Sequence, residues 1–252
     1  MNEGEVISIK RFSEDLFILE LFLKEETSFK PGQFAMVESP GRPLMRPFSI
    51  FQLEGKKLSF LIRAKGPGTN SLLNLRPGKR LRLILPLGKP YPEPEPEGEV
   101  WLLAGGIGIA SLFPLGLLLV KEGFKVKLFW GAKSASHLPF PLLWRFKEGG
   151  LETFLSTEDG SMGQKGLLED LIPSNITAKT IYTCGPVEMI KRIFPKLLSA
   201  PKAYFSLEER MACGLGACRS CVLWMEEIKT VCKEGPVFEK EDLLKWQALK
   251  RP

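Results

Sequence analysis

Four cysteines near the end of the chain restrict its fold and function more than any other sequence feature. Three lie in the run MACGLGACRSC and the fourth follows after ten intervening residues; they are Cys213, Cys218, Cys221 and Cys232. The spacing C-x4-C-x2-C-x10-C matches the plant-type pattern for a [2Fe–2S] cluster, whose two irons a loop must wrap. Gly214 and Gly216 would let such a loop curl until backbone N–H groups face the sulfurs. The spacing therefore predicts a [2Fe–2S] site.

Zinc is the main alternative, because four thiolates also bind zinc. Zinc sites usually contain two C-x2-C pairs or cysteine and histidine pairs, and here only Cys218 and Cys221 form such a pair. Thiols that bind no metal are a third reading. A Rieske centre needs two histidines and is excluded, because His137 is the single histidine of the chain. His137 itself is expected to be a surface or loop residue rather than a catalyst.

The composition and charge are those of a folded globular protein. Hydrophobic residues make up 44% and charged residues 25% of the 252 residues, enough for two domains and a small appendage. The net charge of +6 is spread without a dense basic run, so we expect no nucleic-acid partner. A basic face for an acidic partner protein or an anionic cofactor stays open.

Targeting signals are not evident. The N-terminal run MNEGEVISIKRF lacks the basic-then-apolar order of a signal peptide, and clustered cysteines do not resemble a secreted disulfide framework. We therefore expect a cytoplasmic protein. Residues 100–120 carry no charge and could span a bilayer, but the glycines at 105, 106 and 108 argue against one continuous helix. We expect a buried strand, a turn and a core helix with Pro114 near its first turn.

The pattern of apolar segments changes at the proline- and glutamate-rich run 89–99, which we expect to be an extended linker. Before it, six short apolar segments separated by Gly and Pro predict a small antiparallel barrel. After it, apolar strands alternate with amphipathic helices, which predicts a doubly wound parallel sheet. From Ala203 the pattern breaks into the cysteine segment. We expect an α+β multidomain protein with domains at 1–92, 98–202 and 203–252.

A glycine turn joins the first strand after the linker to its helix. Gly105, Gly106 and Gly108 would let a pyrophosphate approach backbone N–H groups at a helix start. The spacing is GGxGxA rather than GxGxxG, and no acid ends the next strand, KVKLFWGAK, to hold a ribose. A tight structural turn is the alternative.

Two further stretches suggest ligand contacts. Cys184, in the run TCGP, ends a later strand and would face the same crevice as the glycine turn, or it is only a buried thiol. Arg46 and Ser49 in RPFSI, with the small-residue loop 66–71, would suit a second diphosphate cofactor with a flat ring, although each also reads as ordinary strand and loop. Asp159 looks like a turn residue that could touch a ribose.

In combination these motifs resemble a known family. The order RPFS, GT loop, GGIG and TCGP resembles the ferredoxin–NADP reductase superfamily, which pairs an FAD-binding barrel with a nicotinamide-binding sheet. The run SLEERMACGLGACRSC, with VCKEGPVF after it, looks closely like the electron-transfer subunit of NAD-dependent (class 1B) dihydroorotate dehydrogenase. TEDGSMGQKG is also similar to that family, and the likeness covers nearly the whole chain.

The resemblance implies roles for individual residues. The four clustered cysteines would carry the cluster, and Phe48 stands where many relatives have Tyr, so flavin stacking would remain without a hydroxyl contact. FAD would be held by Arg46, Pro47, Phe48, Ser49, Leu61, Ile62, Arg63, Gly68 and Thr69. NAD would be held by Gly105, Gly106, Gly108, Cys184, Gly185 and Pro186. The preference for NAD over NADP rests on the resemblance alone.

The resemblance also implies a function and a partner. Electrons would pass between the FMN of a separate catalytic dihydroorotate dehydrogenase subunit and NAD through the cluster and FAD, in pyrimidine biosynthesis. The two kinds of subunit would form a heterotetramer, and this chain contains no candidate base for dihydroorotate itself.

Two alternatives stay open. One is a sibling reductase subunit that serves a hydrogenase, a sulfite reductase or a ferredoxin-linked partner, and the other is a zinc-stabilised binding module without redox chemistry. The C-terminal run EKEDLLKWQALKRP is expected to form a short amphipathic helix that packs on the protein.

Overall fold

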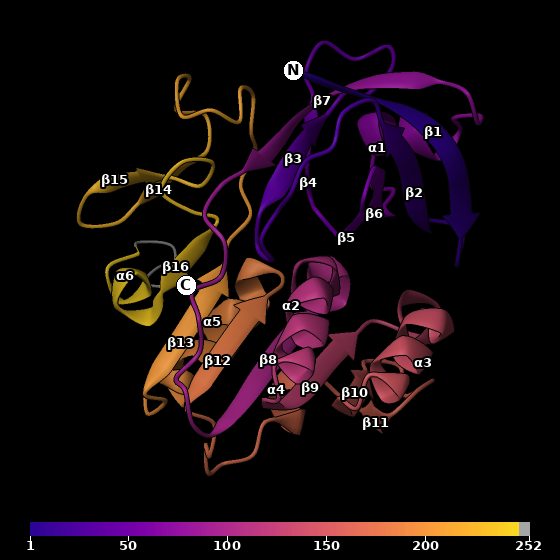
Figure 1. The fold of residues 1–252 in the computed structure, drawn as a ribbon. Helices are drawn as coiled ribbons and strands as arrows, with labels where there is room; N and C mark the ends of the chain where they lie inside the picture. The colour runs from indigo at the N-terminus through magenta and orange to yellow at the C-terminus, as the bar shows by residue number, and fades with distance from the viewer. Residues whose placement is uncertain (247–252) are drawn as a thin grey trace.

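The computed structural model describes residues 1–246, apart from the side chain of Phe140. Its N-terminal part is a curled antiparallel sheet with the strand order β4-β3-β7-β1-β2-β6-β5 and one short helix, α1 (Figure 1). Apolar residues alternate along strands such as RLRLILPL, so one face fills the core. The elements are β1 (Asn2–Arg11), β2 (Leu16–Leu23), β3 (Phe34–Val37), β4 (Arg46–Ser49), β5 (Gln52–Glu54), β6 (Lys57–Arg63), α1 (Pro67–Leu73) and β7 (Arg80–Leu87).

This sheet has seven strands where the sequence suggested six. The run PFSIFQ, expected as one strand, is divided between β4 and β5. Ile50 and Phe51, between them, are fully buried, and the chain bends there so that β4 and β5 lie at opposite edges of the sheet order. Ile50 packs in the core of the curled sheet, whereas Phe51 stacks on Phe113 of the second sheet's helix layer with ring centroids 4.5 Å apart.

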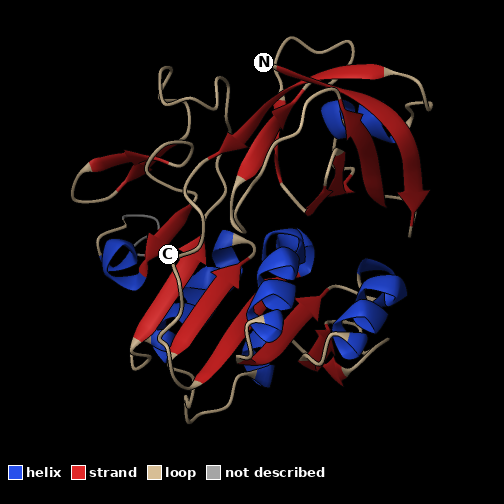
Figure 2. Ribbon diagram, in the orientation of Figure 1, coloured by secondary structure: helices blue, strands red, loops and turns tan. Residues whose placement is uncertain are grey.

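The second sheet is parallel in the order β11-β10-β9-β8-β12-β13 and adds β16 antiparallel at its edge. Helices α2 and α3 contribute to the core on one face and α4 and α5 to the core on the other (Figure 2), so the central strands β8 and β12 are almost entirely buried. The elements are β8 (Glu99–Gly105), α2 (Ile109–Lys121), β9 (Lys125–Ala132), α3 (Phe140–Glu148), β10 (Glu152–Thr157), β11 (Gln164–Lys165), α4 (Leu168–Leu171), β12 (Thr180–Cys184), α5 (Val187–Leu197), β13 (Lys202–Ser206) and β16 (Val237–Glu239).

Two expectations about residues 89–121 need correction. The glycine turn is a short 3-10 helix, η1 (Gly106–Gly108), and α2 begins at Ile109 as expected, so Pro114 is the sixth residue of α2 and lies inside it rather than near its first turn. The proline-rich run is extended but not a free spacer. Tyr91 is buried and its hydroxyl lies 3.0 Å from Ser111 Oγ, while the Tyr182 hydroxyl donates to the Pro92 carbonyl at 2.7 Å. The run is therefore fixed along the second sheet.

The cysteine segment lies between the two sheets at one side of the molecule (Figure 1). After the cysteine loop come a hairpin of β14 (Val222–Trp224) and β15 (Ile228–Thr230), then β16 and helix α6 (Lys240–Leu244). The α6 helix forms the first part of the expected C-terminal helix, and residues 247–252 lie outside the described part of the chain. Among residues 1–246, no helix is long and apolar enough to cross a membrane.

Candidate functional site

A cavity of about 240 Å³ lies where the curled sheet, the parallel sheet and the cysteine segment meet. Its lining includes, from the curled sheet, five of the residues expected to hold FAD beside Arg63: Pro47, Phe48, Ser49, Leu61 and Ile62. Ile107 and Ala110 line it from the parallel sheet, and Glu208 and Met211 line it from the start of the cysteine segment. The walls are mainly apolar with a few convergent polar groups, which suits a flat aromatic cofactor.

Arg46 lies against the loop that begins α1. A Cβ placed on Gly68 would lie 2.7 Å from Arg46 Nε, so only glycine lets the guanidinium approach the first turn of the helix. The Thr69 hydroxyl is used within the loop, where it accepts the N–H groups of Lys65 and Gly66 at 2.9 and 3.2 Å. A fixed cation beside free backbone N–H groups fits a diphosphate, whereas the Thr69 hydroxyl acts on the loop rather than on a ligand.

The glycine turn and the run TCGP touch each other at the carboxyl ends of β8 and β12. A Cβ on Gly108 would lie 2.1 Å from the Cys184 carbonyl oxygen, and a Cβ on Gly185 would lie 2.9 Å from the Gly105 Cα. Burial raises the pKa of the Cys184 thiol, which therefore stays neutral beside the hydroxyls of Ser111 and Ser206. The structure thus brings the expected nicotinamide residues into one crevice.

A second cavity, of about 260 Å³, opens from this crevice over the ends of β8, β9 and β10. Gly105, Gly106 and Pro186 line it, and no protein atom lies within 4 Å of a Cβ placed on Gly106, so the backbone faces open space. Its other lining residues include three that sequence reasoning did not identify: Lys133, Glu158 and Arg192. Lys133 and Arg192 could bind phosphates and Glu158 could accept hydrogen bonds from ribose hydroxyls, so this lining suits a dinucleotide.

The expected ribose residue, Asp159, does not line this cavity. Its carboxylate accepts hydrogen bonds from the Ser161 backbone N–H at 3.0 Å and from the Ser161 hydroxyl at 2.6 Å, so it closes a turn. Glu158, the preceding residue, is the acid that faces the cavity. Strand β9, next to β8, has no acid at its end, as the sequence indicates. Strand β10, the next one along the sheet, is followed directly by Glu158.

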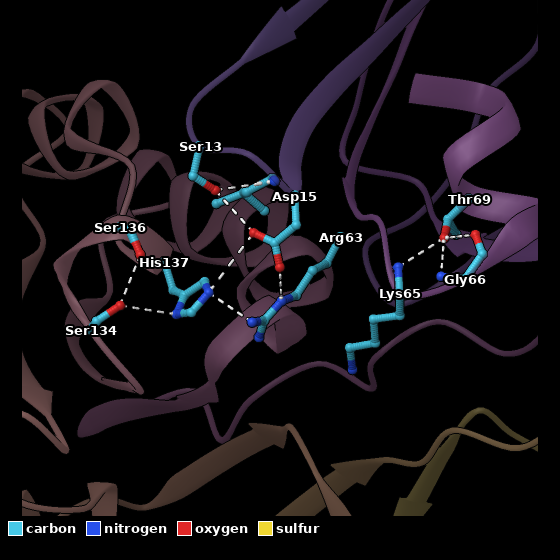
Figure 3. Close-up of polar contacts among 10 residues, drawn as sticks. Ser13, Asp15, Arg63, Lys65, Gly66, Thr69, Ser134, Ser136 and His137 are labelled. Atoms are coloured by element: carbon cyan, nitrogen blue, oxygen red, sulfur yellow. Dashed lines mark hydrogen bonds and ion pairs between the residues drawn. The ribbon is translucent and has the colours of Figure 1, made fainter. Parts of the chain in front are cut away.

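A polar cluster joins the curled sheet to the parallel sheet beside both cavities (Figure 3). Arg63 donates to Asp15 at 2.7 Å, and its Nη2 lies 2.7 Å from His137 Nε2. Because a guanidinium can only donate, His137 Nε2 must accept, which leaves its proton on Nδ1, 3.3 Å from Ser134 Oγ. Burial and the adjacent Arg63 charge lower the pKa of His137. His137 is therefore a neutral link between the two sheets, and it lies in a short 3-10 helix, η2 (Ala135–His137), with a side chain only 16% exposed, rather than on the surface or in a loop.

This link predicts a dependence of stability on pH. A histidine whose pKa is lowered by folding stabilises the fold fully above its unfolded pKa of about 6.5 and loses that contribution as the pH falls. We expect the melting temperature of the loaded protein to fall between pH 7.5 and 5.5, and to fall less in His137→Gln, because the chain has no other histidine. Asp15, Lys133 and Asp159 are the other charges that act on this ring. Equal pH slopes for the two proteins would contradict the assignment.

The four clustered cysteines form two pairs rather than one group. The backbone N–H of Cys218 lies 3.5 Å from Cys213 Sγ, and burial together with the neighbouring Cys221 thiol raises the pKa of Cys232 to about 11. Within residues 1–246, no set of three or more Cys, His, Asp or Glu side chains lies close enough to hold a metal ion. Two pairs of thiols, three from the loop before β14 and one from after β15, fit a dinuclear cluster, which takes two thiolates on each of two irons, better than a single tetrahedral ion.

Backbone N–H groups face these sulfurs. The N–H of Leu215 lies 3.3 Å from Cys213 Sγ, and the N–H of Gly216 lies 3.1 Å from Cys232 Sγ. Gly214 and Gly216 both have positive φ, +71° and +81°, which lets the loop curl as the sequence predicts. The Ser220 hydroxyl beside Cys218 lowers the pKa of this exposed thiol to about 6. An environment that favours a thiolate suits a metal ligand.

The fold and these cavities define a class of protein: a reductase of the ferredoxin–NADP reductase type that carries an additional iron–sulfur segment. A solved structure described as an NADH-dependent reduced ferredoxin-NADP oxidoreductase is similar over 95% of this chain and 88% of its own, with a TM-score of 0.84 and 25% identity. The ferredoxin reductase in carbazole 1,9a-dioxygenase shares the fold, with a TM-score of 0.72 over 81% of this chain and 68% of its own, at 22% identity.

Sequence relatives are more specific. Residues 208–244 match the model for the iron-sulfur cluster binding domain of dihydroorotate dehydrogenase B. A dihydroorotate dehydrogenase B (NAD(+)) electron transfer subunit homolog from Aquifex aeolicus is 36% identical over 96% of this chain and 97% of its own length. The electron transfer subunit from Bacillus cereus strain G9842 is 34% identical over 92% of this chain and 94% of its own. The chain belongs to the family of dihydroorotate dehydrogenase B (NAD(+)) electron transfer subunits.

Family membership and fold together confirm the predicted fold class, the recognised family and the cofactor set of FAD, [2Fe–2S] and NAD. They also confirm that the chain is an oxidoreductase subunit. Which residue holds which cofactor stays a prediction.

Proposed function

We propose that this chain passes electrons between a catalytic dihydroorotate dehydrogenase subunit and NAD, through a [2Fe–2S] cluster and FAD. The observation that carries the proposal is the cavity between the three parts of the molecule. Phe48 and Ser49 reach it from the curled sheet, Ile107 from the parallel sheet and Met211 from the cysteine segment. A cofactor in this cavity would lie between the dinucleotide crevice and the thiols. FAD supplies there the chemistry that exchanges two electrons with NAD(H) and single electrons with an iron–sulfur cluster.

The residues of this chain would bind and orient the cofactors. Arg46 and the loop at Gly68 would hold the FAD diphosphate, while Phe48 and Leu61 would cover its ring. Gly106 would admit the NAD diphosphate, with Lys133 as a counter-charge and Glu158 at a ribose. The two cysteine pairs would each hold one iron. In this assignment residues 1–92 serve FAD, residues 98–202 serve NAD and residues 203–252 serve the cluster.

The partner would be an FMN-containing catalytic subunit, with the two kinds of subunit assembled as a heterotetramer. Cys213 and Cys218 are the more exposed thiols of the four, so the cluster would face the partner on this side. Three large apolar side chains of the same segment are strongly exposed: Leu215 at 58%, Trp224 at 57% and Ile228 at 52%. Exposed apolar groups around a redox centre favour a protein partner there.

The proposal is tested by an anaerobic visible spectrum of the purified chain before and after NADH. Flavin bands and a broad iron–sulfur shoulder, both bleached by NADH, are expected. A colourless protein that contains zinc would leave the zinc-stabilised binding module. Flavin without the shoulder would remove the cluster from the electron path.

A sibling reductase that serves a hydrogenase, a sulfite reductase or a ferredoxin-linked partner would give the same spectrum. The two functions are distinguished by mixing the NADH-reduced chain with candidate partners. Oxidation by an FMN-containing dihydroorotate dehydrogenase subunit with orotate, and by no other partner, supports the assignment.

A further inference from the structure

The Ser220 hydroxyl lies beside the sulfur of Cys218, and the proton of this hydroxyl is available for a hydrogen bond. Ser220 Oγ is 3.2 Å from Cys218 Sγ and accepts the backbone N–H of Ala212 at 2.9 Å. A hydroxyl has one proton to donate. Since the oxygen is already an acceptor for Ala212, that proton can be directed at the sulfur.

The direction of this hydrogen bond depends on whether the thiol is ionised. A free thiol can donate its proton to the serine oxygen, but a cysteine that binds iron is a thiolate and can only accept. Ser220 must then donate. The bond therefore forms between a hydroxyl and a thiolate, which is the stronger, charge-assisted kind.

A second hydroxyl in the same segment is arranged differently. Thr230 contacts Cys232, but its hydroxyl donates to the Glu234 carboxylate at 2.6 Å, and its backbone N–H donates to the same oxygen at 2.7 Å. The single proton of Thr230 is therefore held by Glu234 and is not offered to sulfur. Ser220 and Thr230 therefore differ in where the hydroxyl proton goes.

The backbone around Ser220 is unusual. Arg219, between Cys218 and Ser220, has a φ of +53° and is the one non-glycine residue with positive φ in the part of the chain that the structure describes. Such a conformation is unfavourable for a residue with a Cβ and persists only where its surroundings fix it. The left-handed turn at Arg219 brings the chain back so that Ser220 faces Cys218.

We propose that Ser220 is a positioning residue that raises the reduction potential of the cluster by donating its hydroxyl proton to the Cys218 thiolate. Reduction adds one electron to the cluster and breaks no bond, and the proton stays on Ser220 Oγ throughout. The added negative charge strengthens the hydrogen bond, so the reduced form is stabilised more than the oxidised form. This inference rests on the proposed function, in which the four cysteines hold the cluster.

The test is a potentiometric titration of the loaded protein, with the cluster followed by electron paramagnetic resonance and FAD followed by absorbance. In Ser220→Ala the equilibrium between oxidised and reduced cluster should shift about tenfold toward the oxidised form. The reduction potential of the cluster should therefore fall by about 59 mV for this one-electron couple. Ser220→Thr keeps the hydroxyl and should restore the wild-type value. The FAD potential, measured in the same titration, should not move, which separates the effect from a general change of structure.

A matched pair keeps the test decisive if Ser220→Ala does not retain its cluster. Ser220→Thr and Ser220→Val have the same shape and differ only in the hydroxyl, and position 220 is exposed enough to accept a β-branched side chain. The Val variant should have the lower potential and should lose one exchangeable-proton coupling in the resonance spectrum. Equal potentials for Thr and Val would overturn the inference. A wild-type protein without any cluster signal would instead overturn the assignment of the four cysteines.

Discussion

Cys218→Ser is expected to abolish electron transfer to the catalytic subunit while FAD is still reduced by NADH. Cys218 is one of the two more exposed thiols, and its loss leaves one iron with an incomplete set of thiolates. The cavity proposed for FAD and the crevice proposed for NAD are lined by none of the four clustered cysteines, so both should remain intact. Stopped-flow absorbance would follow flavin reduction by NADH, and NADH formation from dihydroorotate in the assembled complex would follow the coupled reaction.

Cys184→Ser provides the crossed control, because Cys184 is the one cysteine outside the cluster segment. It is buried at the end of β12 beside the glycine turn. A smaller, more polar side chain at this position should slow reduction of FAD by NADH about tenfold, or about 1.4 kcal/mol in the barrier, and leave the cluster signal unchanged. Full coupled activity in Cys218→Ser would remove the cluster from the path, and loss of flavin reduction in Cys218→Ser would mean that the segment supports the FAD site.

The parts of the site that could be predicted from sequence are those fixed by residue type and spacing. Four cysteines at C-x4-C-x2-C-x10-C permit few alternatives, and Gly214 and Gly216 have the positive φ that a curled loop requires. The glycine turn was predictable for the same reason, because Gly105, Gly106 and Gly108 directly follow an apolar strand. Both are local features, determined within a short stretch of chain.

Features that join distant segments could not be predicted in this way. Arg63 and His137 are 74 residues apart and meet because the two sheets face each other, a relation that no local pattern contains. Glu158 was passed over for Asp159, since only the turn at Ser161 determines which of two adjacent acids faces the cavity. In each case the missing information was three-dimensional.

Gly108→Ala should destabilise the protein and stop the reduction of FAD by NADH. The new Cβ would lie 2.1 Å from the Cys184 carbonyl oxygen and 2.9 Å from the Gly185 N, and both of these are backbone atoms that cannot rotate away. The turn after β12 must move, which we expect to cost about 3 kcal/mol. For a chain of this length that corresponds to a fall in melting temperature of roughly 6–12 °C. Thermal unfolding followed by circular dichroism measures the first effect and stopped-flow absorbance the second.

Gly106→Ala, two residues earlier, is expected to affect ligand binding more than stability, because its methyl group would enter the cavity rather than clash with the protein. Its φ is +52° and its Cβ would meet no protein atom within 4 Å, so the expected loss of stability is only the backbone term of about 1 kcal/mol. The methyl group would, however, occupy the cavity where a diphosphate approaches, and the KM for NADH should rise. Gly123→Ala has the same kind of backbone strain at φ +91°, equally without neighbours, in the turn between α2 and β9 away from both cavities. An equal rise in KM in Gly106→Ala and Gly123→Ala would show that strain, rather than contact with the dinucleotide, explains the role of this turn.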